Sequence, residues 1–246
     1  MNRLGLIGKD ISYSFSRGYF ATKFEEQKLP FTYENFDLQH ISEFKQLFTK
    51  NHNIVGFNVT IPYKEEIIPY LDSLNKKARK IGAVNTITID KKGKLKGYNT
   101  DCYGFKKSIK PFLKPHHKKA LILGTGGASK AIAYTLKKQD IKFEYVSRTK
   151  KPGVKFTYET LTSEILNDYT IIINSTPIGT HPNVDECPKI PYDGITNKHF
   201  LFDVIYNPSE TKFLKLGKSK GAEICNGLQM LEYQAEKAWR IWNSTL

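Results

Sequence analysis

A glycine-rich stretch in the middle of the chain has the residue types and spacing of a phosphate-binding turn. A short apolar segment runs into Gly124-Thr125-Gly126-Gly127-Ala128-Ser129, and an amphipathic segment of helical length follows. Gly124 would let the chain turn tightly out of a strand, and Gly126 with Gly127 would let backbone N–H groups approach a pyrophosphate at a helix N-terminus. Ser129 replaces the third glycine of the usual fingerprint, so an ordinary strand-to-helix connection is the alternative.

The next predicted strand, 143–146, ends in a basic segment. In NAD-binding proteins a carboxylate at this place holds the ribose hydroxyls, whereas this chain has Ser147-Arg148-Thr149-Lys150-Lys151. A carboxylate would repel a 2′-phosphate. Arg148 can hold one through two hydrogen bonds, and the lysines add a positive field. The sequence therefore predicts NADP rather than NAD as the cofactor.

Polar side chains also stand at the borders of predicted elements in the first half of the chain. Lys64 lies where a strand gives way to a helix, and Asn85 and Asp101 occupy similar positions. In α/β proteins, ligands bind at the carboxyl ends of strands. Ser14 and Ser16 would point the same way in an extended loop and would suit a polyhydroxylated ligand. The alternatives are a solvated lysine and helix caps at the serine and aspartate positions.

The elements that must position these residues alternate between strand and helix. In the first half of the chain, apolar periodicity predicts strands over 4–8 and 31–36, helices from Arg17 to about Leu29 and over 41–49, and a hairpin that turns at 91–93. In the second half it predicts a βαβ unit over 118–148 and an amphipathic helix over 227–242. Strands that alternate with helices indicate a parallel or mixed sheet covered by helices. We therefore predict an α/β fold.

Length and composition are those of a globular protein. The 246 residues allow one large domain or two modest ones, and 39% hydrophobic with 25% charged residues is ordinary. No window approaches a transmembrane span, and the chain opens directly on an apolar strand without a signal-peptide layout. We expect a cytoplasmic protein that has no membrane partner.

The net charge of +14 could indicate nucleic-acid binding, but the excess lysines are spread along the whole chain and no nucleic-acid motif accompanies them. A solvated basic surface that steers anionic ligands is the better interpretation, so we expect no nucleic-acid partner. Cys102, Cys187 and Cys225 lie far apart and are odd in number, which indicates free thiols. His116 and His117 lack further ligands nearby, so no metal is predicted.

Short blocks with distinctive composition are spread over the whole chain. The first half holds Ser14-x-Ser16, Asn58-Val59-Thr60-Ile61-Pro62-Tyr63-Lys64, Gly82-Ala83-Val84-Asn85-Thr86 and Asn99-Thr100-Asp101. The second half holds Gly124-x-Gly126-Gly127-Ala128, Ile173-Asn174-Ser175-Thr176-Pro177-Ile178-Gly179, Phe202-Asp203-Val204-Ile205-Tyr206-Asn207-Pro208 and Asn226-Gly227-Leu228-Gln229-Met230-Leu231. In this order and spacing, the blocks together resemble the shikimate dehydrogenase family.

The resemblance implies an enzyme that reversibly reduces 3-dehydroshikimate to shikimate with NADPH, on the route to chorismate and the aromatic amino acids. It also implies two domains. The substrate and catalytic domain would consist of residues 1–100 plus 227–246, closed by the C-terminal helices, and a Rossmann-type NADP-binding domain would span residues 101–226. Whether the chain forms a homodimer is left open by the sequence.

The resemblance further assigns roles to individual residues. Lys64 is implied to be the general acid/base, with Asp101 orienting it and binding a substrate hydroxyl. The implied substrate contacts are Ser14, Ser16, Thr60, Asn85, Asp101, Tyr206 and Gln234. The implied cofactor contacts are Gly124, Thr125, Gly126, Gly127, Ala128, Ser129, Ser147, Arg148, Thr149, Lys150, Lys151, Val204, Gly227 and Met230.

Two residues depart from the family pattern, which usually has Asn at the position of Ser147 and Gly at that of Gln229. Ser147 in place of Asn affects a hydrogen bond to the adenosine ribose. Gln229 in place of Gly would crowd the part of the site that holds the nicotinamide. The rival interpretations are a quinate/shikimate dehydrogenase that uses NAD and a non-catalytic dinucleotide-binding regulator. Arg148 favours NADP, and the presence of both Lys64 and Asp101 favours an enzyme.

Overall fold

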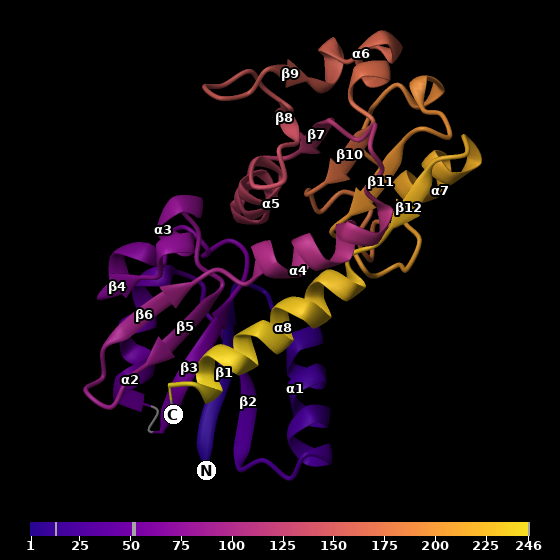
Figure 1. Ribbon diagram of the computed structural model, residues 1–246. Helices are drawn as coiled ribbons and strands as arrows, with labels where there is room; N and C mark the ends of the chain where they lie inside the picture. The colour runs from indigo at the N-terminus through magenta and orange to yellow at the C-terminus, as the bar shows by residue number, and fades with distance from the viewer. Residues whose placement is uncertain (13, 51–52, 246) are drawn as a thin grey trace. The chain divides into compact units, whose positions relative to one another are not determined.

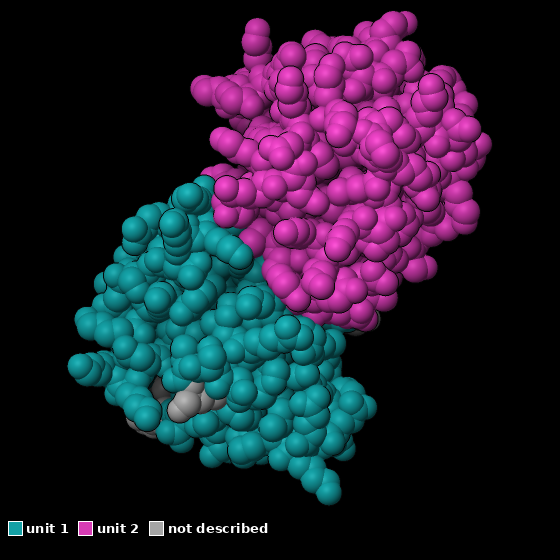
Figure 2. All heavy atoms as spheres, in the orientation of Figure 1, with its two compact units in different colours: residues 1–100, 235–246 teal, residues 101–234 magenta. Residues whose placement is uncertain are grey.

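The computed structural model describes residues 1–12, 14–50 and 53–245 (Figure 1). Residues 13, 51, 52 and 246, which fall within the expected substrate domain, lie outside the described residues. The chain divides into two compact units, coloured separately in Figure 2: unit 1 comprises Met1–Thr100 and Ala235–Leu246, and unit 2 comprises Asp101–Gln234. The second division falls inside helix α8 (Leu228–Asn243), whereas the sequence suggested a return at Gly227, directly before that helix.

Unit 1 is built on a mixed six-stranded sheet. Its strands are β1 (Asn2–Gly8), β2 (Phe31–Asp37), β3 (Ile54–Val59), β4 (Ser73–Leu74), β5 (Thr86–Ile89) and β6 (Leu95–Tyr98), in the order β2-β1-β3-β5-β6-β4. Strand β1 pairs in parallel with β2 and β3, while β5 is antiparallel to β3 and β6. Because β5 runs opposite to β3, the start of β5 lies beside the end of β3. The strands predicted over 4–8 and 31–36 are confirmed.

The helices of unit 1 are short apart from α1. They are α1 (Phe15–Glu26), the 3₁₀ helix η1 (Ile41–Gln46), α2 (Leu47–Lys50), the 3₁₀ helix η2 (Ile68–Tyr70) and α3 (Lys76–Ile81). The helix predicted over 41–49 is therefore confirmed, and the structure adds that most of this segment is a 3₁₀ helix while its end is α-helical. The backbone N–H of His40 donates to the Glu43 carboxylate at 2.7 Å, and this local bond fixes the start of the 3₁₀ helix.

The C-terminal part of α8 belongs to the core of unit 1. Ala235, Ala238 and Trp242 are fully buried there in a cluster with Phe20 and Tyr33. The indole Nε1 of Trp242 donates to the carbonyl of Ile87 at 2.9 Å. The predicted helix over 227–242 is confirmed. Residues on its apolar face pack against side chains from the first hundred residues and form one hydrophobic core with them.

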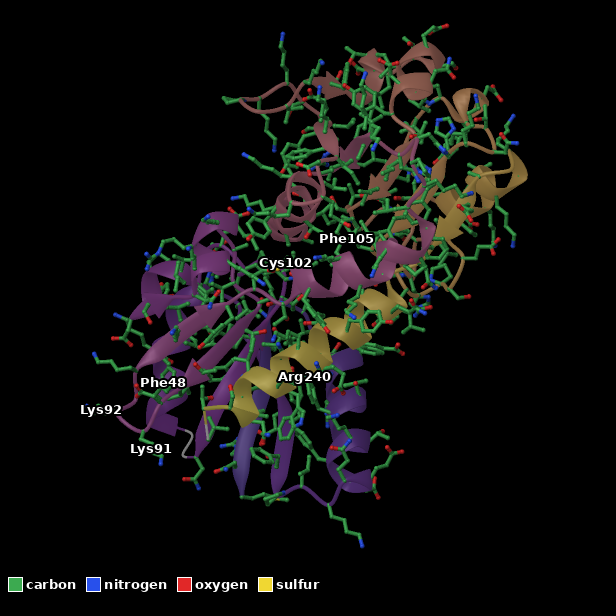
Figure 3. The ribbon with its side chains drawn as sticks, in the orientation of Figure 1. Phe48, Lys91, Lys92, Cys102, Phe105 and Arg240 are labelled. Atoms are coloured by element: carbon green, nitrogen blue, oxygen red, sulfur yellow. The ribbon has the colours of Figure 1, made fainter. Side chains whose placement is uncertain are left out.

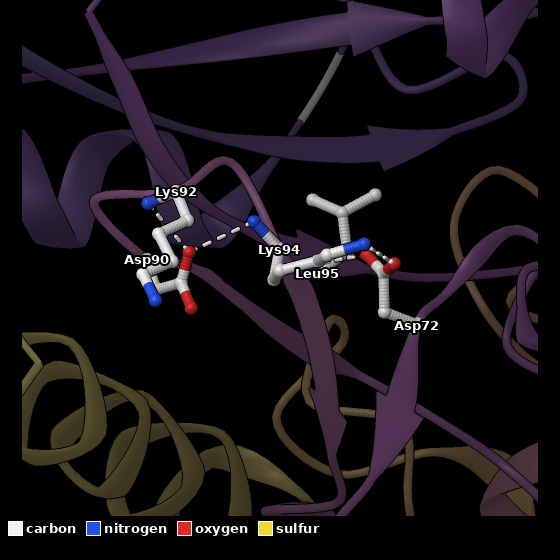
Figure 4. Close-up of polar contacts among 5 residues, drawn as sticks. All are labelled: Asp72, Asp90, Lys92, Lys94 and Leu95. Atoms are coloured by element: carbon white, nitrogen blue, oxygen red, sulfur yellow. Dashed lines mark hydrogen bonds and ion pairs between the residues drawn. The ribbon is translucent and has the colours of Figure 1, made fainter.

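The predicted hairpin at 91–93 joins β5 to β6 (Figure 4). The Asp90 carboxylate accepts hydrogen bonds from the backbone N–H groups of Lys92 at 2.8 Å and Lys94 at 2.9 Å. The Asp72 carboxylate stabilises the start of β6, because one of its oxygens accepts a hydrogen bond from the Lys94 ammonium at 2.9 Å and the other accepts from the Leu95 N–H at 2.8 Å. The side chains of Lys91 and Lys92 are exposed at the tip (Figure 3).

Unit 2 contains a parallel six-stranded sheet of Rossmann type. Its strands are β7 (Lys119–Leu123), β8 (Lys142–Ser147), β9 (Phe156–Thr157), β10 (Ile171–Asn174), β11 (Phe200–Asp203) and β12 (Glu223–Cys225), in the order β12-β11-β10-β7-β8-β9. Strands β8 and β9 follow β7 on one side of the sheet, and the chain then crosses to the other side of β7, where β10, β11 and β12 lie in succession. Read in chain order this is the 3-2-1-4-5-6 arrangement of dinucleotide-binding folds, and its switch point lies between β7 and β10.

Helices and apolar clusters cover both faces of this sheet. The helices are α4 (Asp101–Ile109), η3 (Lys110–Phe112), α5 (Gly127–Lys137), η4 (Tyr158–Thr160), α6 (Ser163–Asp168), η5 (Tyr192–Gly194), α7 (Lys212–Ser219) and the first part of α8. Alternate residues of β7 enter different clusters, Ile122 with Phe105 and Phe202 in one and Leu121 in the other. The βαβ unit predicted over 118–148 is confirmed. Across the described ranges, no helix combines the length and apolarity needed to cross a membrane.

Candidate functional site

The predicted substrate residues of unit 1 come from one edge of its sheet. Ser14 and Ser16 follow β1, Thr60 and Lys64 follow β3, and Asn85 immediately precedes β5. Because β1 and β3 are parallel and β5 is antiparallel to β3, the ends of β1 and β3 and the start of β5 share that edge. The topology therefore gathers hydroxyl, ammonium and amide groups that are up to 71 positions apart in the sequence.

The two serines stand at the N-terminus of α1. Ser14 is the helix N-cap, and its hydroxyl oxygen accepts a hydrogen bond from the N–H of Arg17 at 3.4 Å, so the capping alternative is confirmed for this residue. Ser16 is buried in the first turn. The positive end of the helix dipole favours an anionic group at this place, which is compatible with a ligand carboxylate.

The loop that carries Lys64 is held by backbone hydrogen bonds on both sides. The N–H of Thr60 donates to the carbonyl of Ile7 on β1 at 2.8 Å, and the carbonyl of Lys64 accepts from the N–H of Val84 at 2.7 Å. The Lys64 side chain is half-buried, and Ile61, three residues earlier in the same loop, is 68% exposed, which is unusual for a large apolar side chain. The loop thus fixes the backbone of the lysine close to the block that contains Asn85.

The Asn85 amide makes two hydrogen bonds to Thr100, the residue that precedes Asp101. Its Oδ1 accepts from the N–H of Thr100 at 2.7 Å, while its Nδ2 donates to the Thr100 hydroxyl at 2.9 Å. Both residues are buried, at 2% and 0% exposure. Asn85 therefore fixes the backbone leading to Asp101, a role that the sequence did not indicate.

Asp101 and Gln234 both belong to unit 2, where α4 and α8 pack closely. Asp101 is the first residue of α4, where a negative charge is favoured by the helix dipole, and is 5% exposed. Gln234 on α8 is 6% exposed. At Gly104 a Cβ atom would lie only 2.4 Å from the carbonyl oxygen of Met230, so glycine is needed for this approach of the two helices.

The glycine-rich turn has the geometry expected of a pyrophosphate cradle. It connects β7 to α5, and Gly124 has φ +100°, the left-handed conformation that favours glycine. Gly126 is the N-cap of α5, and a Cβ built on it would meet no atom within 4 Å. Ser129 is buried, and its hydroxyl donates to the Gly126 carbonyl at 2.6 Å. An open helix N-terminus of this kind fits the dinucleotide that the sequence predicts.

The basic segment after β8 reaches this turn. The Lys151 ammonium donates to the Thr125 hydroxyl at 2.6 Å, which joins the segment predicted to hold the 2′-phosphate to the glycine-rich turn. Arg148, Thr149 and Lys150 are exposed and Ser147 is half-buried. The residues present fit a phosphorylated dinucleotide, because cationic donors and helix N–H groups lie along one edge of the sheet.

A buried carboxylate organises the remaining cofactor loop. Asp203, at the end of β11, accepts hydrogen bonds from the Asn174 amide at 3.1 Å, the N–H of Ile205 at 3.1 Å and the Thr211 hydroxyl at 2.7 Å. Burial raises the pKa of Asp203 to about 6, although the three donated hydrogen bonds act in the opposite direction. Asp203 thereby fixes the backbone that continues into the half-buried Tyr206.

Gly227, Met230 and Gln229, which are expected near the nicotinamide, differ in their packing and exposure. Gly227 approaches Val204 so closely that a Cβ atom would lie 2.1 Å from the Val204 carbonyl oxygen. Met230 is 7% exposed in the core of unit 2, so its side chain packs chiefly against protein. Gln229, one of the departures from the family pattern, is exposed.

Sequence reasoning missed three buried polar residues around the site: Tyr33, Asn58 and Asp203. Asn58 and Asp203 were part of the quoted blocks but received no role, and Tyr33 was read as part of an apolar strand. A polar side chain in an otherwise apolar strand was the available signal, since such groups are hydrogen-bonded when buried. The described residues contain no group of three or more His, Cys, Asp or Glu side chains able to hold a metal ion, and the three cysteines are free.

An α/β unit with polar ligand-type groups at one sheet edge, joined to a Rossmann-type unit with an open glycine-rich turn, defines a two-domain dinucleotide-binding protein. Comparison with known proteins narrows this class. Residues 6–87 match the profile of the shikimate dehydrogenase substrate binding domain. The chain is 41% identical to the shikimate dehydrogenase (NADP(+)) of Clostridium beijerinckii, over 98% of this chain and 92% of that protein. It belongs to the shikimate dehydrogenase family.

Solved structures agree with this assignment. The shikimate dehydrogenase of Aquifex aeolicus superposes with a TM-score of 0.88 at 36% identity, covering 99% of this chain and 93% of that one. The shikimate 5-dehydrogenase of Thermus thermophilus, solved in complex with NADP(H) and shikimate, superposes with a TM-score of 0.87 at 29% identity, covering 100% and 95%. The predicted α/β fold with two domains, one of Rossmann type, is confirmed.

Proposed function

We propose that the chain catalyses the reversible NADPH-dependent reduction of 3-dehydroshikimate to shikimate. The observation that carries the proposal is the sheet edge of unit 1, where Lys64 stands beside the serine, threonine and asparagine groups that a polyhydroxylated acid requires, in a chain of this family. The functional division we propose is a substrate domain made of residues 1–100 and the C-terminal helix, with a cofactor domain between them. NADPH, when bound, supplies the hydride.

Lys64 would act as the proton donor and acceptor. Hydride addition to a ketone builds negative charge on its oxygen, so a protonated Lys64 would donate its proton there, and in the reverse direction the neutral amine would accept it from the hydroxyl. Asp101 would orient the ammonium and accept a hydrogen bond from a substrate hydroxyl. The anchored backbone on either side of Lys64 supports this role, because proton transfer needs a fixed donor position.

The remaining polar groups would bind the rest of the ring. The substrate carboxylate would suit Ser14 and Ser16 at the positive end of α1, together with Tyr206, and the ring hydroxyls would suit Thr60, Asn85, Asp101 and Gln234. A site built from such hydrogen bonds rejects analogues that leave its polar groups unpaired, by about 10⁴-fold. Arg148, Lys150 and Lys151 would favour the 2′-phosphate of NADP, while the glycine-rich turn, Val204, Gly227 and Met230 would contact its other parts.

The direct test is initial-rate formation of reduced nicotinamide, with shikimate or quinate as substrate and NADP⁺ or NAD⁺ as cofactor, each pair assayed separately. We expect turnover with shikimate and NADP⁺. Turnover confined to quinate with NAD⁺ would contradict the substrate and cofactor assignment, and binding of NADP⁺ without turnover of any pair would indicate a non-catalytic regulator.

Lys64→Ala should lower kcat for shikimate by about 10²- to 10⁴-fold, the usual contribution of a positioned acid/base. Lys91→Ala is the matched control, because this lysine is exposed at the tip of the β5–β6 hairpin (Figure 3) and its loss should leave kcat unchanged. Near-normal turnover of the Lys64 variant would reject the assignment of the proton donor.

A further inference from the structure

Helices α4 and α8 (Figure 1) approach each other closely at Gly104 in unit 2. A Cβ atom at Gly104 would lie 2.4 Å from the carbonyl oxygen of Met230, 3.2 Å from Cβ of Gln234 and 3.3 Å from the Gln234 nitrogen. Met230 and Gln234 are four positions apart, which is the spacing of one helical hydrogen bond. Gly104 therefore packs against the single turn of α8 that carries Gln234.

Two of the residues proposed to bind shikimate lie at this helix crossing. Asp101 and Gly104 are three positions apart in α4, and residues at this spacing share one face of a helix. Asp101 is therefore on the face of α4 that packs against α8, and Gln234 is on the facing turn of α8. Both residues are nearly buried, at 5% and 6% exposure. The separation of the two helices thus sets the distance between the backbones that carry Asp101 and Gln234.

Helix α4 is fixed to the rest of unit 2 by other contacts. Phe105 is fully buried in a core cluster, where its ring meets the Phe202 ring edge to face with centroids 5.2 Å apart. On α5, the Thr135 hydroxyl lies 2.8 Å from the carbonyl oxygen of Ala131 and 3.2 Å from that of Cys102 in α4, so it can donate to both. A side chain added at the crossing is therefore not easily relieved by movement of α4.

The first part of α8 is held by fewer buried side chains. Of the residues from Leu228 to Gln234, only Met230 and Gln234 are buried, and these are the two residues at the crossing. A methyl group in place of the Gly104 hydrogen would have to move the Met230 carbonyl oxygen from 2.4 Å to at least 3.0 Å, the shortest approach that Cβ atoms show. This movement would displace the turn of α8 and Gln234 with it.

We propose that Gly104 is a positioning residue of the substrate site. Because it has no side chain, α8 approaches α4 closely enough for Gln234 to bind a shikimate hydroxyl alongside Asp101. This inference rests on the proposed function. Misplacement of a binding group by about 1 Å can cost about 10²-fold, whereas the proposed phosphate contacts of the cofactor come from the glycine-rich turn and the basic segment after β8. Gly104→Ala therefore weakens shikimate binding more than NADP⁺ binding.

The experiment is a double-mutant cycle on the full-length chain with Gly104→Ala, Gln234→Ala and the double variant. KM for shikimate and kcat are measured at saturating NADP⁺, which also stabilises the folded variants, and calorimetry gives the Kd of NADP⁺. Gly104→Ala should raise KM for shikimate at least about tenfold, with kcat and the Kd of NADP⁺ within about threefold. In the Gln234→Ala background it should raise KM less than about threefold, because the displaced amide is already absent.

Gln234→Asn tests the same point without an added methyl group. The shorter side chain withdraws the amide by one methylene, about 1.5 Å, and keeps the Cβ atom that faces Gly104. This variant should raise KM for shikimate at least about fivefold. An unchanged KM would show that the place of the amide does not matter for binding, and would overturn the inference even if Gly104→Ala proved too unstable to assay.

Gly217→Ala is the matched control for a loss of stability in unit 2. Gly217 is a buried glycine of helix α7, which packs against β11 and β12, and a Cβ atom there would lie 2.2 Å from Cδ2 of Leu201. The control variant should lower the melting temperature and leave KM for shikimate unchanged. A rise in KM equal to that of Gly104→Ala would show that the effect is a general loss of stability, which contradicts a positioning role.

The wild-type protein separates this inference from the function on which it rests. A wild-type chain that neither binds nor turns over shikimate rejects the proposed function, and the positioning role with it. If the wild type turns over shikimate while Gly104→Ala leaves KM unchanged, or raises it equally with and without Gln234, the positioning role alone is rejected.

Discussion

Asp203 shows how a single buried carboxylate links the geometry of a cofactor loop to pH. It is fully buried at the end of β11, and burial raises its pKa from 3.8 to about 6. The folded protein therefore binds the proton more tightly than the unfolded chain does. The resulting contribution to stability is complete below pH 3.8 and is lost as the pH rises through about 6, a change of about 3 kcal/mol.

Asp203→Asn should remove this pH dependence. Asparagine keeps the acceptor that faces Asn174 and the N–H of Ile205, and the Thr211 hydroxyl can turn to accept from the new amide. The free energy of unfolding of the variant minus that of the wild type should rise by up to about 3 kcal/mol between pH 4 and pH 7. Urea unfolding across this range measures the difference, since other titrating groups cancel. Parallel curves for the two proteins would contradict the prediction.

Residue types alone were sufficient to predict the glycine-rich turn and the basic segment after β8, because both are contiguous in sequence and their chemistry is local. The buried hydrogen bonds of Tyr33 and Asn58 could not be predicted in this way. Their partners come from β2, β3 and β5, and hydrogen bonds between strands depend on a register that no single segment encodes. Ser14 shows the intermediate case, since helix capping and ligand binding use the same hydroxyl and sequence cannot separate them.

At the scale of elements, the β7–α5 connection offers a clean test of the cofactor site. Gly126 has φ −81°, which alanine adopts without strain, and its missing Cβ would extend into open space at the α5 N-terminus. Gly126→Ala should therefore fold, at a cost of about 1 kcal/mol for the poorer N-cap. Its methyl group would occupy the space needed by a pyrophosphate, so KM for NADP⁺ should rise at least about tenfold.

Gly18→Ala is the matched control for that substitution. Gly18 lies in α1, is exposed, and a Cβ there also meets no atom within 4 Å. The variant should gain about 0.5–1 kcal/mol from alanine's higher helix propensity and keep KM for NADP⁺ unchanged. If Gly126→Ala binds NADP⁺ as tightly as the Gly18 variant does, the α5 N-terminus is not the pyrophosphate site.

The boundaries of elements were predicted less well than their existence. The α/β alternation follows from the strands and helices predicted within residues 4–49, and the βαβ unit follows from the two apolar runs that form β7 and β8. The segment over 41–49 has helical periodicity, but the period cannot distinguish a 3₁₀ from an α-helix over so few residues, and the local His40–Glu43 bond decided between them.

The whole molecule adds a constraint that neither half of the sequence reveals alone: unit 1 is closed by the end of the chain. Ala235, Ala238 and Trp242 are 0% exposed within its core, and Gly56 is required because a Cβ atom there would lie 2.4 Å from the Trp242 indole nitrogen. A substrate domain formed mainly by the first hundred residues is therefore completed only when residues 235–245 are in place. This is why a change near the C-terminus should destabilise a unit that begins at residue 1.

Trp242→Ala should lower the free energy of unfolding of unit 1 by about 3–5 kcal/mol, because it removes a fully buried ring and leaves the Ile87 carbonyl without its donor. Trp239→Ala is the comparison, since Trp239 on the same helix is only half-buried and should cost clearly less. Urea unfolding should be followed by circular dichroism for both variants, and by hydrogen exchange at β1 and β3 to assign the loss to unit 1. Equal losses for the two tryptophans, or protection lost in unit 2 first, would show that the C-terminal helix does not close the core of unit 1.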